Sequence, residues 1–518
     1  MESNEILEFC IQKGLLLDKE ILNLFSETKD IDSVKLIIEK IKSHTRERII
    51  TRDVFDQNNE QVCKVFSALP EENQKVLEKL KIKLGLSIEI SKEIERPAEI
   101  VEEKASFNGI KVVSTLQSSL KKIETKDFVN YFRNRFNEMR NVLQNNPKLT
   151  NLVSLNKISG SRQGISVIGI VSDKRITKNK NILLEIEDST GKIRVLINQN
   201  KQELYKKGEE ITPDSVLGFI GSGNSEILFA NEVIFPDSQI LKRKRSPVEE
   251  SALFIGDIHY GSKLFMENNF LKFIDYLNGK VPNTPEVENI KYLFIIGDLI
   301  AGVGNYPAQE KDLKVKDMEE QFIGIAKLLG KIRKDIQIII SPGNHDGVRL
   351  MEPQPLIGEK YGWALYDLDN VVLTGNPASI NLGAVSTFPG FDVLTYHGFS
   401  FPFYANTIPS LIMSKGLNSP DKIMSYLLKH RHLAPTHTST QYFPNEEDNL
   451  IIKKIPDIFV SGHTHKSAVS YYNNILMISI ASWEAKTEYQ EKMGNEPDFC
   501  KVPMFNLKTR EVKILDFE

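Results

Sequence analysis

The stretch IPDIFVSGHTHKS, residues 455–467, joins an apolar run to a glycine and two histidines that lie two positions apart. The apolar run has the composition of a buried strand, and the glycine allows the chain to turn sharply where that strand ends. Only nine histidines occur in the 518 residues, so two of them on one turn indicate a functional site. The pattern predicts an α/β domain whose functional side chains follow its strands.

Four further apolar runs end in the same way. Each is rich in Ile, Val, Leu, Phe or Tyr and stops at a polar turn marked by glycine. In chain order they are ALFIGDIHYGS (252–262), NIKYLFIIGDLIAG (289–302), IQIIISPGNHD (336–346) and FDVLTYHGFSF (391–401). Because open α/β sheets place their ligands at the carboxyl ends of strands, we expect the side chains that follow these runs to meet.

The side chains on these turns are donors that divalent metal ions use. Imidazoles, carboxylates and the oxygen of an Asn side chain all bind such ions. One carboxylate can bridge two ions, and two ions about 3.5–4 Å apart can stabilise in-line displacement at a phosphate ester. The candidate residues are Asp257, His259, Asp298, Asn344, His345, Asp346, His397, His463 and His465.

A structural interpretation of each motif also exists, since a lone buried histidine or a lone Gly-Asp after a strand is more often structural than ligating. Five of the nine histidines fall at the five strand ends, which favours the metal site. His430, His432 and His437 lie in the polar segment KHRHLAPTH without a preceding strand, and we expect them at the surface.

The composition is that of an ordinary globular protein with three or four domains, because 518 residues exceed one hydrophobic core. The formal net charge of -3 means that any nucleic-acid surface is local. Three scattered cysteines form no disulfide framework, which indicates a reducing compartment. The first residues, MESNEILEFC, lack a signal-peptide pattern, and no apolar run reaches the roughly 18 residues of a membrane span. We therefore expect a cytoplasmic protein with no membrane contact.

The first quarter of the chain is predicted to hold helices and a linker. Apolar residues at helical spacing predict a small helical N-terminal module over residues 1–80. Residues 81–127 are rich in Glu, Lys and Ser and predict a flexible linker. Helical periodicity returns at residues 128–143, either as a helix that packs on a core or as one whose basic residues contact DNA.

The periodicity then changes to two. About five strands, together with the preceding helix, fill residues 128–240 and suit an OB-type β-barrel. Such barrels bind single strands, but these strands are poor in aromatic residues, so a scaffold or subunit contact is an equal alternative. Residues 241–250, with the sequence KRKRSP, form a basic linker that is solvated or touches phosphate. The domain with the strand-end motifs is predicted over residues 251–518.

The series GDIHYG, GDL, GNHD, YHG and GHTH resembles the calcineurin-like metallophosphoesterase superfamily over about residues 251–490. The resemblance implies an α/β fold, an α+β sandwich, that binds two divalent ions. One ion would be held by Asp257, His259 and His465, the other by Asn344, His397 and His463, with Asp298 bridging the two. His345 would act on the scissile phosphate as proton donor or charge stabiliser, oriented by Asp346. Many relatives carry an acid three residues after the bridging Asp, where this chain has Ala301.

The order of the domains and the segment SWEAKTEYQ, residues 482–490, are similar to the small-subunit family of archaeal D-family DNA polymerases. This resemblance implies a 3′–5′ exonuclease that proofreads single-stranded 3′ ends of DNA. It also implies the large polymerising subunit as a partner, the sliding clamp as a further contact and a nucleoid-associated location. Mixed nitrogen and oxygen ligation favours Mn²⁺, with Mg²⁺, iron and zinc as alternatives. The rival functions are a DNA-repair metallonuclease and a scaffold subunit without catalysis.

Overall fold

The computed structural model falls into two compact units, Met1–Glu102 and Glu103–Glu518. The described residues are 2–18, 21–22, 34–35, 38, 49–50, 109–114, 122–158, 160 and 162–518. In the first unit, helix α1 (Glu2–Gln12) is followed by strand β1 (Leu16–Leu17), which pairs in parallel with β2 (Ile49–Ile50). The remaining helices predicted for residues 1–80 lie largely outside the described residues.

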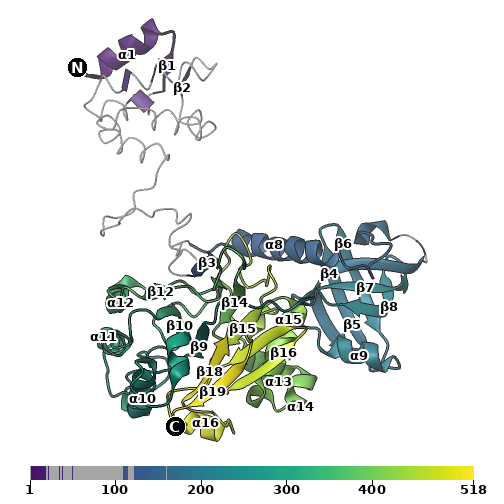
Figure 1. The fold of residues 1–518 in the computed structure, drawn as a ribbon. Helices are drawn as coiled ribbons and strands as arrows, with labels where there is room; N and C mark the ends of the chain where they lie inside the picture. Colours follow the sequence, from purple (N-terminus) through teal and green to yellow (C-terminus); the bar gives the residue numbers. More distant parts are fainter. Residues whose placement is uncertain are drawn as a thin grey trace. The chain divides into compact units, whose positions relative to one another are not determined.

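Two six-stranded sheets pack face to face in the second unit (Figure 1). The first sheet has the order β12 (Val371–Leu373), β11 (Gln337–Ser341), β10 (Ile290–Ile296), β9 (Ser251–Ile255), β18 (Lys501–Asn506), β19 (Val512–Asp516). The second has the order β16 (Ala468–Tyr472), β17 (Ile475–Ser479), β15 (Ile458–Ser461), β14 (Phe391–Tyr396), β13 (Ala378–Leu382), β3 (Ile110–Ser114). Phe254 and Phe294 of the first sheet share one buried core with Val393 and Ile458 of the second.

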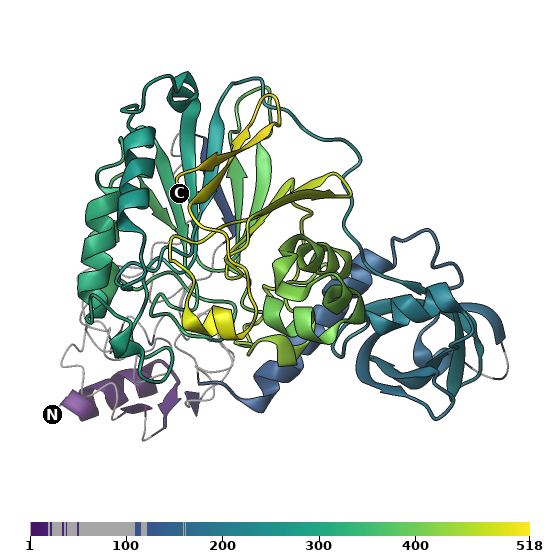
Figure 2. The ribbon, with the colours of Figure 1, turned by 90° about the horizontal axis from the view of Figure 1, so that it is seen from below.

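Helices cover the outer faces of both sheets (Figure 2). The first sheet is covered by α10 (Glu267–Leu277), α11 (Met318–Leu329) and α12 (Glu359–Tyr366). The second is covered by α8 (Thr125–Leu143), α13 (Phe401–Thr407), α14 (Pro409–Met413) and α15 (Pro420–His430). Shorter helices are α16 (Glu488–Lys492), η1 (Leu155–Lys157), η2 (Pro285–Asn289), η3 (Gln309–Lys311), η4 (Gly416–Asn418) and η5 (His437–Ser439). The four layers agree with the α/β sandwich expected from the strand-end motifs.

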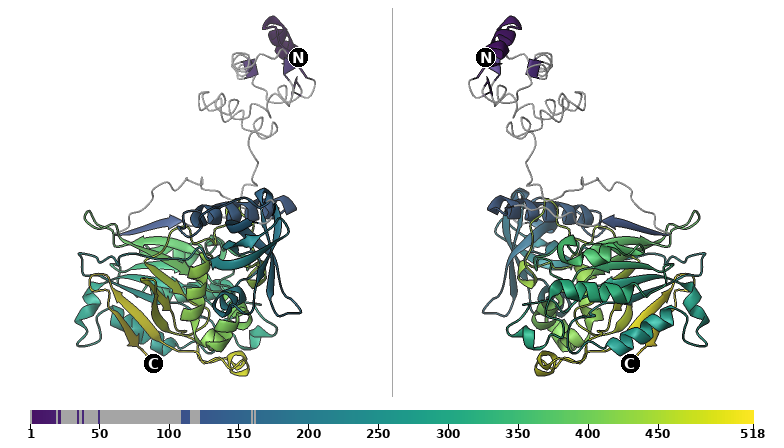
Figure 3. Two further views of the ribbon diagram at one scale, coloured as in Figure 1. Left: turned by 90° about the vertical axis from the view of Figure 1, so that its right-hand side faces the viewer. Right: turned by 90° about the vertical axis from the view of Figure 1, so that its left-hand side faces the viewer.

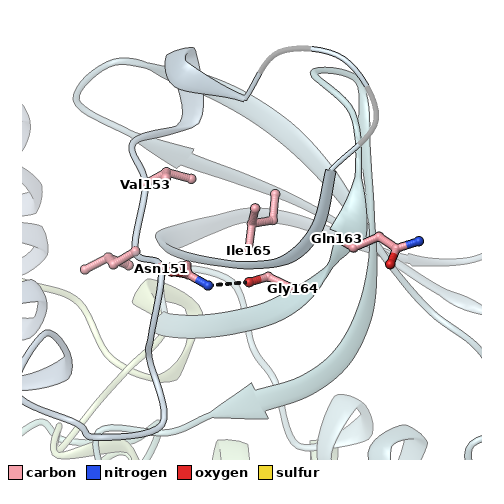
Figure 4. A pocket seen from close by; sticks show the side chains of 6 residues that line it. Asn151, Val153, Gln163, Gly164 and Ile165 are labelled. Carbon is pink, nitrogen blue, oxygen red and sulfur yellow. Dashed lines mark hydrogen bonds between the residues drawn. The ribbon is translucent and has the colours of Figure 1, made fainter.

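Five strands between α8 and β9 close into a barrel with the order β4-β5-β6-β8-β7. They are β4 (Arg162–Ile176), β5 (Ile182–Asp188), β6 (Gly191–Ile197), β7 (Val216–Gly223) and β8 (Ile227–Ile234), with α9 (Gln202–Glu209) between β6 and β7. Alternate residues of β5, such as Leu184 and Ile186, fill the interior, as the period of two predicts. A hollow of about 400 Å³ opens beside the start of β4, where Asn151 donates a hydrogen bond to the Gly164 carbonyl oxygen (Figure 4).

Helix α8 packs on the second sheet through a buried polar cluster. The carboxylate of Asp448 accepts hydrogen bonds from Tyr131 Oη and Arg135 Nε, each at 2.6 Å. His432 Nε2 lies 2.9 Å from the same carboxylate. Arg135 and Asp448 are 1% and 0% exposed, so this basic residue of α8 serves packing and is not available to DNA.

The surface positions expected for His430 and His432 are wrong. Both side chains are buried, at 3% and 2% exposure, whereas His437 is exposed as predicted. The ring of His430 packs against Tyr426, and His432 meets Asp448 sixteen residues further along the chain. These partners lie outside the polar segment from which the surface position was predicted.

Two segments predicted as linkers contain ordered contacts. Within residues 81–127, β3 pairs antiparallel with β13 and forms the edge of the second sheet (Figure 3). Within the basic segment 241–250, Lys244 Nζ lies 2.6 Å from Asp457 and 3.3 Å from Asp392. This lysine is therefore paired with protein carboxylates, not with phosphate. Within the described ranges, no helix has both the length and the apolar character that a membrane crossing requires.

Replacing Arg135 with Met should strongly destabilise the second unit, because the Asp448 carboxylate would remain buried without its cation. Breaking a buried ion pair in this way costs about 3–5 kcal/mol. Urea unfolding of the variant measures this loss. The exposed pair of Lys148 with Glu232, at 2.7 Å, provides the control, and Lys148→Ala should cost at most about 1 kcal/mol. Equal losses in the two variants would contradict the proposed role of Arg135.

Candidate metal centre

The side chains predicted for the site come from both sheets and gather at one edge. The turns after β9, β10 and β11 belong to the first sheet, and those after β14 and β15 belong to the second. These strands are parallel to their neighbours within each sheet, so their carboxyl ends lie together. The residues brought together are Asp257, His259, Asp298, Asn344, His345, His397, His463 and His465.

Asp257, His259 and His465 form the first group, in which one ligand atom of each lies within 4.8 Å of the others. His259 Nε2 is 3.2 Å from His465 Nε2, and His465 Nε2 is 3.5 Å from Asp257 Oδ1. Two nitrogens bound to one ion at about 2.1 Å lie roughly 3.0–3.4 Å apart. The spacing therefore fits three ligands of a single ion.

Asp298, His397 and His463 form the second group, again within 4.8 Å. Asp298 Oδ2 lies 3.2 Å from His397 Nε2 and 3.8 Å from His259 Nε2 of the first group. Asn344 Oδ1 lies 3.1 Å from His397 Nε2. The Asp298 carboxylate thus lies between the two groups, where a bridging ligand has to be.

The cluster buries charge that a metal pair would neutralise. Asp298 is 2% exposed, and although burial opposes its charge, His397 and the other nearby histidines hold its pKa well below the usual value. Burial lowers the pKa of His397, but Asp298 raises it to about 10. Burial and the charge of His397 lower the pKa of His463 to about 3. Metal ligands are neutral imidazoles and ionised carboxylates, so bound cations would replace the proton on His397.

Five of the seven predicted metal ligands have a left-handed backbone. The φ angles are 47° at Asp257, 52° at His259, 49° at Asp298, 65° at His463 and 55° at His465. Such angles are uncommon outside glycine, and strained residues concentrate at functional sites. The strained turns direct these side chains from two separate sheets toward one point.

Two glycines are required by the close approach of the ligands. A Cβ atom at Gly343 would lie 2.3 Å from Asp298 Oδ1, and a Cβ atom at Gly297 would lie 2.3 Å from His397 Nδ1. Real Cβ atoms do not approach other atoms so closely. The glycines in the sequence motifs GD and GNHD therefore make room for the ligands of the neighbouring strands.

His345 lies at the edge of the cluster. One of its ring nitrogens is within 4.8 Å of ligand atoms of His259 and Asp298. Its Nδ1 is 2.7 Å from the carbonyl oxygen of Ala301 and 2.9 Å from Asn305 Nδ2. A carbonyl only accepts, so Nδ1 carries a hydrogen and donates it to the Ala301 oxygen. The Asn305 amide nitrogen is itself a donor, so it cannot bond this protonated Nδ1 and donates to the same carbonyl oxygen at 3.1 Å.

That Asp346 orients His345 stays a prediction, and the structure shows two backbone partners of its carboxylate. Its carboxylate accepts the backbone N–H groups of Gly343 at 2.8 Å and Ile300 at 3.0 Å. Burial and the charge of Asp298 raise the pKa of Asp346 to about 7. Asp346 thus fixes the backbone of two turns that carry candidate ligands, while the ring of His345 is held by the Ala301 carbonyl oxygen.

Sequence reasoning missed several residues that support the ligands. Gln490 Nε2 lies 2.9 Å from His465 Nδ1, and Asn376 Oδ1 accepts the backbone N–H of His397 at 2.8 Å. A local signal existed for Gln490, because Thr487 and Gln490 form the capping box of α16. Asn376 precedes β13 in a segment without a recognisable motif.

Asp298→Ala should lose both ions together, because its carboxylate lies between the two groups, and His397→Ala should weaken mainly one. Metal analysis of the purified variants after dialysis against Mn²⁺ measures the equivalents bound. Asp275→Ala is the control, since it removes an exposed carboxylate that pairs with Lys280 at 2.8 Å. Two full equivalents in Asp298→Ala would exclude the bridging role.

Comparison with known proteins places these features in a family. The calcineurin-like phosphoesterase family matches residues 251–467. The DNA polymerase II small subunit of Methanothermobacter thermautotrophicus is 34% identical over 82% of this chain and 88% of that protein. The DNA polymerase II small subunit of Pyrococcus furiosus is 37% identical over 75% of this chain and 63% of that protein. The chain therefore belongs to the family of archaeal DNA polymerase II small subunits and carries a calcineurin-like phosphoesterase domain.

Proposed function

We propose that this chain is a two-metal 3′–5′ exonuclease that removes nucleotides from single-stranded 3′ ends of DNA for a DNA polymerase. The observation that carries the proposal is the complete set of seven ligands in two groups joined by Asp298. A scaffold without catalysis would have no use for five strained ligand positions. The polymerase subunits among its relatives favour proofreading over repair.

Two ions at this site would supply an activated water nucleophile and stabilise negative charge on the scissile phosphate. The residues that would hold them are those of the two groups, with Asn344 in the second. The donor set mixes imidazole nitrogens with carboxylate and amide oxygens. Such mixed ligation favours Mn²⁺ over Mg²⁺, which prefers oxygen ligands.

His345 would complete the chemistry without binding metal. The Ala301 carbonyl holds Nδ1, so that a protonated ring would present its Nε2–H to the substrate. A donor in this position stabilises charge on the phosphoryl oxygens or protonates the leaving 3′ oxygen. The Nδ1 bond to the Ala301 carbonyl and the bond from the His345 backbone N–H to Asp298 at 2.8 Å support a fixed orientation.

The barrel is proposed to be an OB-type barrel that contacts the large polymerising subunit. Its strand order, with α9 between the third and fourth strands, supports this type. The outer face of β5 and β6 pairs its own charges, with Lys192 2.7 Å from Glu187 and Arg194 3.8 Å from Glu226. A surface whose charges are already paired is better suited to contact another protein than to bind the anionic DNA backbone.

His345→Ala should keep both ions and still bind single-stranded DNA, but cut it more slowly. Loss of a charge-stabilising donor costs about 10²–10³-fold in rate. Metal analysis, DNA binding and single-turnover cleavage with Mn²⁺ are measured on the same preparation. His437→Ala, which removes an exposed histidine, is the matched control. Loss of a metal from His345→Ala would make this residue a ligand, and an unchanged rate would remove it from the mechanism.

A chain that starts at residue 103 should still assemble with the large subunit, because the proposed contacts lie on the barrel and the phosphoesterase domain. This start keeps β3 paired with β13, which a start inside α8 would not. Co-purification of the shortened chain with the large subunit is the measurement. Loss of the complex would assign the contact to residues 1–102.

A further inference from the structure

An exposed aromatic ring lies next to Asn305, which contacts the His345 ring. Tyr306 follows Asn305, whose Nδ2 is 2.9 Å from His345 Nδ1. The Tyr306 side chain is 45% exposed, and its hydroxyl donates to Asp312 Oδ2 at 3.0 Å. The Tyr306 ring therefore exposes apolar surface to solvent. It is adjacent in sequence to Asn305, which contacts His345 of the candidate site.

The loop that carries Tyr306 is held by buried hydrogen bonds. Gln309, at 2% exposure, accepts the backbone N–H of Asn305 through Oε1 at 2.8 Å. Its Nε2 donates to the Ala301 carbonyl oxygen at 2.9 Å, the same oxygen that holds the His345 ring. A ring on such a fixed support loses little conformational freedom when a ligand binds.

Two lysine side chains, those of Lys263 and Lys311, lie at the loop that carries Tyr306. The backbone N–H of Lys263 donates to the Asp312 carbonyl oxygen at 2.9 Å, and its Nζ donates to the Lys311 carbonyl oxygen at 2.6 Å. Lys263 and Lys311 are both exposed. Together the three residues offer one aromatic face and two ammonium groups beside the site, which is the chemistry of single-strand recognition.

We propose that Tyr306 stacks on a nucleobase next to the scissile phosphate, with Lys263 and Lys311 facing the DNA backbone. This subsite rests on the proposed nuclease function and names its substrate contact. Stacking tolerates every base, because each has a π-face, and so suits a nuclease that removes any terminal nucleotide. A base can stack on Tyr306 only after it has separated from its partner in the duplex. The subsite would therefore favour frayed or mismatched 3′ ends.

The test compares the full chain with Tyr306→Ala, Tyr306→Phe and the control Tyr361→Ala, which removes another exposed tyrosine (41%). The substrates are 5′-labelled oligothymidylate and the same strand with abasic sites at the terminal and penultimate positions. We expect Tyr306→Ala to raise KM for the base-bearing strand about 5- to 150-fold, with kcat unchanged. KM for the abasic strand should not change, and Tyr306→Phe and Tyr361→Ala should behave as the parent chain. A structural defect would affect both strands alike.

Two results would overturn the subsite: an unchanged KM in Tyr306→Ala, or an equal rise for base-bearing and abasic strands. Unchanged cleavage combined with weaker assembly with the large subunit would also overturn it and assign the ring to a protein contact. If the parent chain cuts neither strand, the nuclease proposal fails. Fluorescence anisotropy then decides the subsite separately, since equal affinity of the parent chain for the two strands would exclude stacking.

Discussion

Two carboxylates buried between the sheets are the constraint on which the site depends. Asp257 accepts the backbone N–H of His463 at 3.0 Å, so a residue of the first sheet holds a turn of the second. Asp298 accepts the backbone N–H of His345 at 2.8 Å and so fixes the turn after β11. A carboxylate out of water needs compensating charge. Here backbone amides and imidazoles supply part of the compensating charge. Bound cations would supply the remaining charge.

The strained turns follow from this constraint. Ligands from two sheets can reach a common point only if the chain turns sharply at each strand end, and the left-handed angles at five ligands reflect that demand. The glycines beside them leave the space that the neighbouring ligands fill. Asp346, which binds two backbone amides, stabilises the same turns from within the core. Metal binding would thus use geometry that the protein fold has already set.

The meeting of the strand-end side chains could be predicted because each motif contains its strand, its glycine and its candidate ligand in one short segment. The burial of His432 could not, since Asp448 and Arg135 of α8 come from other parts of the chain. Strand β3 could not be predicted either. It lies in a segment rich in charged residues, and its partner β13 is distant in the sequence. The backbone partners of Asp346 could not be predicted either, because they are amides of two separate turns. Ala301 contributes through its carbonyl oxygen, which every residue type possesses.

The loop from Ala301 to Asp312 joins the metal centre to the surface. It holds the His345 ring at one end and exposes Tyr306 further along, so the proposed stacking subsite and the proposed proton donor depend on the same buried Gln309. An acid at position 301 would add charge close to Asp298. With alanine there, the orientation of the His345 ring rests on the loop backbone.

Anomalous diffraction from crystals of the protein soaked in Mn²⁺ tests the central claim most directly. The account predicts two peaks about 3.5–4 Å apart, with Asp298 bound to both and the ring of His345 bound to neither. A single peak, or a manganese ion bound by the imidazole of His345, would contradict it.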